Sequence, residues 1–120
     1  AAAAIQQSLR QAFEASDLRL LVFTHLSHVY PDGASVYTTF LFPRAPEPEA
    51  TTSVWRTAKQ AVSRTILRAG GTISHQHGVG LDHAPYLEAE KSATGLSLLR
   101  AACMALDPDG LLNPGKLLPG

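Results

Sequence analysis

The chain has 120 residues, the size of a single domain. Ten basic side chains balance ten acidic ones, so the sequence indicates neither a nucleic-acid partner nor a strongly acidic one. The composition, 45% hydrophobic and 17% charged, is that of a globular protein. No apolar run approaches the roughly 18–20 residues of a membrane span, so we expect no span.

Cys103 is the single cysteine, which excludes an internal disulfide and a metal site of the CxxC type. A lone thiol fits a reducing compartment, and the start of the chain lacks the features of a signal peptide. We therefore expect a cytoplasmic protein. The first residue is not Met and lies inside a helical pattern, which predicts a piece of a longer protein.

The first 42 residues predict a helix followed by a β-hairpin. Apolar residues recur every four positions over 1–15, which gives the helix one apolar stripe: Ile5, Leu9 and Phe13. Two segments rich in β-branched and aromatic residues, 18–30 and 34–42, predict strands. The Asp32-Gly33 pair between them is typical of a tight turn.

Residues 43–52 read as a Pro-rich loop, followed by a helix that begins at a cap and ends at a glycine pair. The candidate caps are Thr51, Thr52 and Ser53. Segment 72–74 is short and β-prone.

The last third of the chain predicts a short helix over 84–91 and a longer one over 94–106. We expect Glu88 and Glu90 to lie on the solvent-facing side of the short helix. The whole pattern predicts an α+β fold, with a small antiparallel sheet, helices on one face in a ferredoxin-like arrangement, and a helical C-terminal segment.

A polar group is expected on one face of the hairpin. Side chains alternate along a strand, so a two-residue turn places His28, Ser35 and Tyr37 on the same face. A solvent-facing side of the sheet explains this pattern as well as a binding site does.

The segment "GGTISHQHGVG" (70–80) carries His75 and His77 on either side of Gln76, between glycines. In an extended segment both imidazoles would lie on one side, and each could take or give a proton near neutral pH. The glycines would let the backbone approach a ligand closely. Histidines that merely belong to a turn remain an alternative.

The polar residues allow two further arrangements. His25 and His28 could join His75 and His77 around zinc, but residues three apart on a strand face opposite ways unless a bulge intervenes, so no metal is expected. Asp82 and the adjacent His83 could form a pair that orients an imidazole, although neighbours in sequence rarely face each other.

Three segments together resemble a known family. They are "SHVYPDGASVYTTFLF" (27–42), "GGTISHQHGVG" (70–80) and "LRAACMALDPDGLLNPGKLL" (99–118). They resemble the C-terminal part of FAD-linked oxidases of the vanillyl-alcohol oxidase type, above all the alkylglycerone-phosphate (alkyldihydroxyacetonephosphate) synthase branch. The similarity runs from about residue 18 to the end of the chain.

The resemblance implies a domain organisation. Residues 1–80 would be part of a substrate-binding cap domain, and 81–120 a C-terminal helical segment that returns toward the flavin domain. FAD would be bound mainly by an N-terminal portion that this sequence lacks, so the chain alone should be inactive. The implied partners are that FAD-binding portion and a small-molecule substrate; a homodimer is left open.

The resemblance also implies residue roles. Tyr37 falls on the family's active-site tyrosine, and the catalytic residues would be His75, His77 and Tyr37. The substrate would contact His28, Ser35 and Gln76. The residues near the flavin would be Gly78, Gly80, Asn113 and Lys116, although plain surface charge explains Lys116 equally well.

Gln76 departs from the synthase pattern. It replaces the middle member of a His-His-His run that acts as the acid–base group in that branch, and glutamine does not exchange a proton near neutral pH. Oxidation of a hydroxy acid or a related alcohol is therefore expected, with the ether-lipid synthase reaction as the alternative. Rivals from other classes are a non-catalytic ferredoxin-like binding module and a zinc hydrolase.

Overall fold

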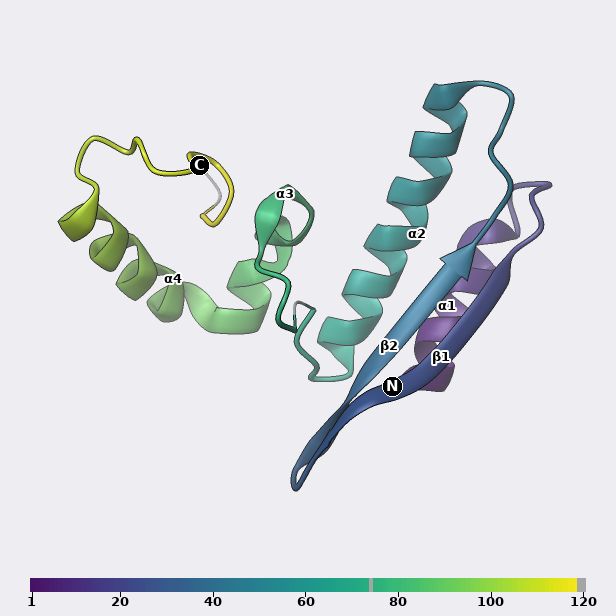
Figure 1. Cartoon of the computed structure of the whole chain (residues 1–120), viewed down its shortest axis with the longest axis horizontal. Coiled ribbons are helices and arrows are strands. Elements are labelled where there is room, and N and C mark those ends of the chain that lie inside the picture. The colour runs from purple at the N-terminus through teal and green to yellow at the C-terminus, as the bar shows by residue number, and fades with distance from the viewer. Residues whose placement is uncertain (74, 119–120) are drawn as a thin grey trace. The chain divides into compact units, whose positions relative to one another are not determined.

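The computed structural model describes residues 1–73 and 75–118. The chain divides into two compact units, Ala1–Gly71 and Thr72–Gly120. In chain order the elements are α1, β1, β2 and α2 in the first unit, then α3, a 3-10 turn and α4 in the second (Figure 1).

The first unit contains α1 (Ala2–Phe13), β1 (Leu21–Tyr30), β2 (Gly33–Leu41) and α2 (Pro48–Arg68). The expected apolar stripe of α1 is buried, with Leu9 completely inaccessible. Burying one leucine side chain contributes about 2 kcal/mol, so this stripe fixes the helix against its neighbours. The predicted helix and both predicted strands are confirmed; α1 and β1 are shorter than expected by three residues each, and β2 begins and ends one residue earlier than expected.

The core lies between the two helices and one face of the hairpin. Ala58 of α2 is fully buried, which lets the helix approach α1 closely. The ring of Phe13 meets the rings of Phe40 and Phe42 edge to face, at centroid distances of 6.4 and 5.0 Å. Both helices therefore cover the same face of the sheet, and the predicted α+β class is confirmed (Figure 1).

The hairpin is antiparallel and turns at residues 31–32. From Leu21↔Leu41 to Leu26↔Val36 the pairing is regular, and it shifts by one residue before His28↔Ser35. Ser27 is thus the extra residue of a β-bulge. A bulge reverses the alternation of side chains beyond it, and this affects which histidines share a face.

Helix α2 begins earlier than expected. It starts at Pro48, with Glu47 as the preceding cap residue, because proline's fixed φ suits the first turn of a helix. The hydroxyls of two expected caps make other hydrogen bonds. Thr51 accepts from the Ala45 amide at 3.0 Å, and Thr52 donates to the Pro48 carbonyl at 3.0 Å. The prediction of a cap at 51–53 was wrong.

The predicted end of α2 at the glycine pair is confirmed. Gly70 adopts a φ of +70°, and the amides of Gly70 and Gly71 donate to the carbonyls of Leu67 and Ile66. This is the hydrogen-bond pattern of a Schellman motif. A side chain at Gly71 would lie 3.1 Å from the Ile66 methyl carbon, so both glycines are explained by the helix end and not by a ligand.

The second unit is helical. Its elements are α3 (Gly80–His83), a 3-10 turn (Ala84–Tyr86) and α4 (Leu87–Leu106). Helix α4 is broken at Ser92, whose φ of 66° and ψ of 163° are not helical, which agrees with the two helices predicted there. Thr72 and Ile73 are not in a strand, and Ser74, the third residue of the expected β-prone segment, lies outside the described residues.

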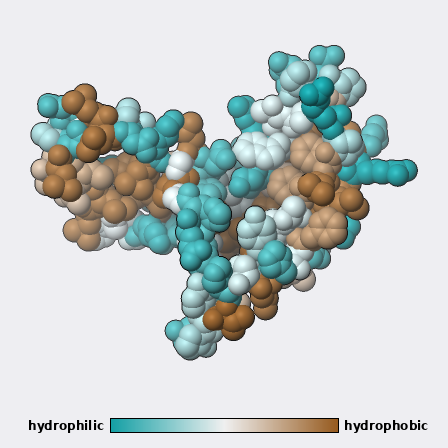
Figure 2. All heavy atoms as spheres, viewed as in Figure 1, coloured by the Kyte–Doolittle hydropathy of each residue, from teal (hydrophilic) through white to brown (hydrophobic). Residues whose placement is uncertain are grey.

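Apolar side chains remain on the surface of both units (Figure 2). In the second unit they follow α4 and the segment after it, with Leu98, Met104 and Leu106 more than two-thirds exposed. Across residues 1–73 and 75–118, no helix has both the length and the apolar character needed to cross a bilayer.

Candidate active site

The loop that carries the two histidines is bent. Residues 75–77 form bends, and Gln76 has a φ of +66°, a left-handed conformation that is uncommon outside glycine. The expectation of an extended segment was therefore wrong, and alternation along a strand does not determine where the imidazoles point. His75 is half-buried, whereas Gln76 and His77 are exposed.

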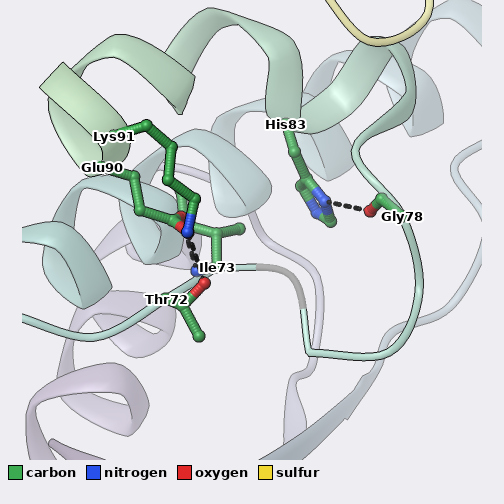
Figure 3. A network of polar contacts seen from close by, with 6 residues as sticks. All are labelled: Thr72, Ile73, Gly78, His83, Glu90 and Lys91. Atoms are coloured by element: carbon green, nitrogen blue, oxygen red, sulfur yellow. Dashed lines mark hydrogen bonds and ion pairs between the residues drawn. The ribbon is translucent and has the colours of Figure 1, made fainter. Parts of the chain in front are cut away.

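Glu90 of α4 holds the start of this loop (Figure 3). Its carboxylate accepts a hydrogen bond from the Thr72 hydroxyl at 2.5 Å on one oxygen and from the Ile73 amide at 3.1 Å on the other. The ammonium of Lys91 lies 3.0 Å from the first oxygen. The Glu90 side chain is only 14% exposed, so the prediction that it lies on a solvated helix side was wrong. Glu88 is exposed, as expected.

These contacts determine the charge state of Glu90. Partial burial raises the pKa of the carboxyl, but the hydrogen bonds from Thr72 and Ile73 and the charge of Lys91 together lower it by more. The net pKa lies below the ordinary value of 4.5. Glu90 is therefore ionised at neutral pH and acts only as an acceptor.

His83 of α3 contacts the other end of the loop. Its Nδ1 lies 3.4 Å from the carbonyl oxygen of Gly78 (Figure 3). A carbonyl can only accept, so the Nδ1–H of His83 is the donor. The hydrogen bond of the His83 ring therefore goes to the loop, and the imidazole is oriented by Gly78 and not by Asp82. The loop is thus held before His75 by α4 and after His77 by α3.

In the first unit, the hairpin gathers a second set of polar side chains. His28 pairs with Ser35, and Tyr37 follows Ser35 by two residues, so the prediction that these three share a face is confirmed. The bulge at Ser27 adds His25 to this face, because His25 pairs with Tyr37. The bulge, which was the exception to the expected opposite orientation of His25 and His28, is therefore present, and the two histidines share this face.

Aromatic stacking orders this face of the hairpin. The ring of His25 stacks on Tyr37 at 5.2 Å between centroids, and the ring of His28 stacks on Tyr30 at 6.3 Å. The Ser27 hydroxyl lies 3.1 Å from Nδ1 of His28. Within residues 1–73 and 75–118, no group of three or more His, Cys, Asp or Glu side chains is placed to hold a metal ion.

The two sets of predicted site residues belong to different units. The structure brings together His28, Ser35 and Tyr37 on the hairpin, and separately His75, Gln76 and His77 on the loop. His25 was expected only as a candidate zinc ligand, because the bulge that places it on the face of His28 and Tyr37 leaves no residue signature. Glu90 and His83 were missed because their roles depend on folding back of α3 and α4 onto the loop.

The tail residues predicted to lie near the flavin are exposed. Asn113 has a φ of +48°, and Lys116 lies three residues later. The carboxylate of Asp107 fixes the chain just before them, accepting from the amides of Leu111 and Leu112 at 2.9 and 2.7 Å. The segment "DPDG" therefore ends α4 and anchors the first part of the tail.

The glycines after His77 offer open backbone to a cofactor. Gly78 and Gly80 have φ values of +70° and +61°, and a side-chain carbon added at either would meet nothing within 4 Å. This fits the approach of a planar ring system against bare backbone. The roles at a flavin expected for Gly78, Gly80, Asn113 and Lys116 stay predictions, since the same open space surrounds Gly33 and Gly110.

Comparison with known proteins identifies the family. The family model "FAD linked oxidases, C-terminal domain" matches residues 1–117. An alkyldihydroxyacetonephosphate synthase of Trypanosoma brucei brucei is 28% identical over 97% of this chain and 19% of its own length. A D-2-hydroxyglutarate dehydrogenase of Stutzerimonas stutzeri is 30% identical over 84% of this chain and 21% of its own length.

Glycolate oxidase subunit GlcD of Bacillus subtilis is 45% identical over a shorter stretch, 42% of this chain and 11% of its own length. The chain spans about a fifth of the two relatives that it matches over most of its length. No solved structure matches it. Because the family model covers nearly all of the sequence, the chain belongs to the C-terminal domains of FAD linked oxidases, a family whose cofactor is FAD.

Proposed function

We propose that this chain is the C-terminal, substrate-side portion of an FAD-dependent oxidoreductase that oxidises a hydroxy acid or a related alcohol. The observation that carries the proposal is the loop of a FAD-linked oxidase domain with two imidazoles, His75 and His77, around Gln76, held at both ends by α3 and α4. Residues 1–80 would contribute to the substrate-binding cap, and 81–120 would return toward the flavin domain.

The names of several relatives support the substrate class. They include D-2-hydroxyglutarate dehydrogenase, glycolate oxidase and D-lactate dehydrogenase, and each named substrate carries a hydroxyl next to a carboxylate. Two relatives that match nearly the whole chain are alkyldihydroxyacetonephosphate synthases, which favours the ether-lipid reaction as the second candidate. The presence of Gln76 argues against the ether-lipid reaction, because a side-chain amide cannot act as an acid or a base at neutral pH.

The chain's own residues would divide the work as follows. A ring nitrogen of His75 or His77 takes the substrate's hydroxyl proton, since a neutral imidazole is a base near pH 7. His28 and Ser35 on the hairpin, with Gln76 on the loop, hold the anionic end of the substrate, and Tyr37 orients the reacting carbon. Bound FAD supplies the two-electron oxidant.

The partners follow from the same proposal. FAD is bound mainly by an N-terminal portion of the same protein, so the chain alone is inactive even with added FAD. Turnover by the isolated chain would contradict this part of the proposal. A homodimer and a cytoplasmic location remain predictions.

The first experiment is a visible absorption spectrum of the protein expressed from the intact reading frame. A flavin band that bleaches anaerobically on addition of a 2-hydroxy acid supports the oxidase or dehydrogenase reaction. A band that ignores such acids favours the synthase-like reaction. If no flavin binds after FAD is added, the functional proposal fails and a non-catalytic binding module becomes the better explanation.

Two variants assign the base. His75→Ala and His77→Ala are compared. The variant that lacks the base should bleach the flavin band roughly 100-fold more slowly or slower still, in line with general-base contributions of 10²–10⁴. If the other imidazole only contacts the substrate, the variant that lacks it should have a higher KM and a smaller change in kcat. Equal and small effects of both variants would exclude these histidines as the base.

A further inference from the structure

We propose that Glu90 is a positioning residue for the active-site loop: its carboxylate on α4 fixes the chain immediately before His75 and thereby sets the position of both imidazoles. The inference rests on the proposed function only in assigning the two histidines to the substrate. The hydrogen bonds of Glu90 to Thr72 and Ile73, called the clasp below, do not depend on that assignment.

The clasp joins consecutive donors to the two oxygens of one carboxylate. Oε1 accepts from the Thr72 hydroxyl and Oε2 from the Ile73 amide, while Lys91 contributes charge to Oε1 (Figure 3). A hydroxyl and a backbone amide held side by side restrict both the position and the direction of the chain at Ile73. His75 follows only two residues later, so the anchor acts directly on the loop.

Burial makes the carboxylate effective as an anchor. The Glu90 side chain is 14% exposed, whereas Lys91 is 51% exposed, so the carboxylate is the more sheltered member of this ion pair. Hydrogen bonds to a charged acceptor are stronger than neutral ones, and partial exclusion of water from the acceptor strengthens them further. The clasp is thus suited to hold a bent segment that lacks strand or helix pairing of its own.

The two carboxylate oxygens are what this position contributes. An alanine would remove both acceptors, so neither hydrogen bond to Thr72 or Ile73 could form, whereas a glutamine could still accept from the Ile73 amide and donate to the Thr72 hydroxyl. Misplacement of a catalytic group by about 1 Å can lower a rate by about 100-fold. Loss of the clasp is therefore expected to affect kcat more than folding.

The first test is NMR of histidine ring carbons in the 120-residue chain during a pH titration. With Glu90→Ala, the ring signals of His75 and His77 should shift or broaden, while those of His25 and His28 on the hairpin stay unchanged. Glu88→Ala, which removes an exposed carboxylate from the same helix, is the matched control and should alter none of the four. Unchanged His75 and His77 signals, or equal changes at all four histidines, would overturn the proposal.

A second pair of variants tests the donor side. Thr72→Val removes the hydroxyl and should shift the His75 and His77 signals in the same direction as Glu90→Ala, whereas Thr72→Ser keeps the hydroxyl and should leave the signals as in the parent chain. Altered signals in the serine variant would count against the clasp.

Activity measurements on the whole flavoprotein then separate the two proposals. Glu90→Ala should lower kcat by roughly 10- to 100-fold with an unchanged flavin spectrum, and Glu88→Ala should not. An unchanged kcat in a protein that does oxidise hydroxy acids overturns the positioning role. If the parent protein oxidises no hydroxy acid, the functional proposal fails, while the NMR result still decides whether Glu90 positions the loop.

Discussion

The ring of His25 on β1 stacks against the ring of Tyr37 on β2, with 5.2 Å between centroids and 28° between ring planes. The two residues are direct cross-strand partners. His28 reaches the same face only because Ser27 is inserted between Leu26 and His28 in the pairing register. The aromatic and imidazole groups of this face are therefore ordered by one register shift and one stacked pair.

The stacked pair should couple energetically. Cross-strand aromatic pairs contribute roughly 0.2–1 kcal/mol, so a double-mutant cycle with His25→Ala and Tyr37→Ala should give a coupling of about 0.5 kcal/mol. Urea unfolding followed by the fluorescence of Trp55, the single tryptophan, reports on the unit that contains the pair. Val29→Ala is the control partner, because Val29 pairs with Ala34 and its effect should add to that of Tyr37→Ala.

The bulge predicts different outcomes for two deletions in β1. Removing Ser27 takes out the extra residue and leaves the pairs on both sides in place, so unfolding should stay cooperative. Removing Thr24 shifts the regular part by one residue, which turns Val22 and its core-facing neighbours toward solvent. Trp55 fluorescence during urea unfolding should show a normal transition for the first deletion and a lost or early one for the second.

The fold was largely predictable from local patterns. The stripe of Ile5, Leu9 and Phe13 predicts α1 because helical periodicity leaves a direct trace in the sequence, and Asp32-Gly33 predicts the turn for the same reason. The start of α2 at Pro48 was missed because proline suits both a loop and the first turn of a helix. The bulge was missed because a register shift is decided by packing and not by residue type.

The site was predictable only in part. The glycine-flanked pair His75 and His77 stands out in the sequence, whereas the residues that hold it do not. Glu90 looks like a solvated helix residue until Thr72, 18 positions earlier, is brought against it. The positive φ of Gln76 was also not foreseeable, because its neighbours suggest an extended segment. Such features arise from contacts distant in sequence.

The clasp should depend on pH in the acidic range. The lowered pKa of Glu90 means that folding favours the ionised carboxylate, so its stabilising effect is complete above the ordinary pKa of 4.5 and is lost as the pH falls through the lower, folded-state value. The amide signal of Ile73 should titrate with a midpoint below 4.5 in an NMR experiment. A midpoint above 4.5 would contradict the hydrogen-bonded, ionised carboxylate.

The stabilities of two variants at Ser92 should separate the effect of backbone strain from that of helix capping. Its φ of 66° with ψ of 163° lies in a region that glycine adopts freely and other residues adopt at a cost of about 1–3 kcal/mol. Its hydroxyl also accepts from the Gly95 amide at 3.4 Å, as a cap of the second half of α4. Ser92→Gly removes the strain and loses a weak cap, whereas Ser92→Ala keeps the strain and loses the cap.

Calorimetric unfolding should therefore rank Ser92→Gly at or above the parent chain and Ser92→Ala below it by about 1 kcal/mol. Ser97→Ala, an exposed serine in the regular part of α4, is the control and should change little. If glycine and alanine destabilise α4 equally, the hydroxyl contact to Gly95 outweighs the backbone strain at Ser92. If neither variant changes the transition, the break in α4 contributes nothing to the stability of the second unit.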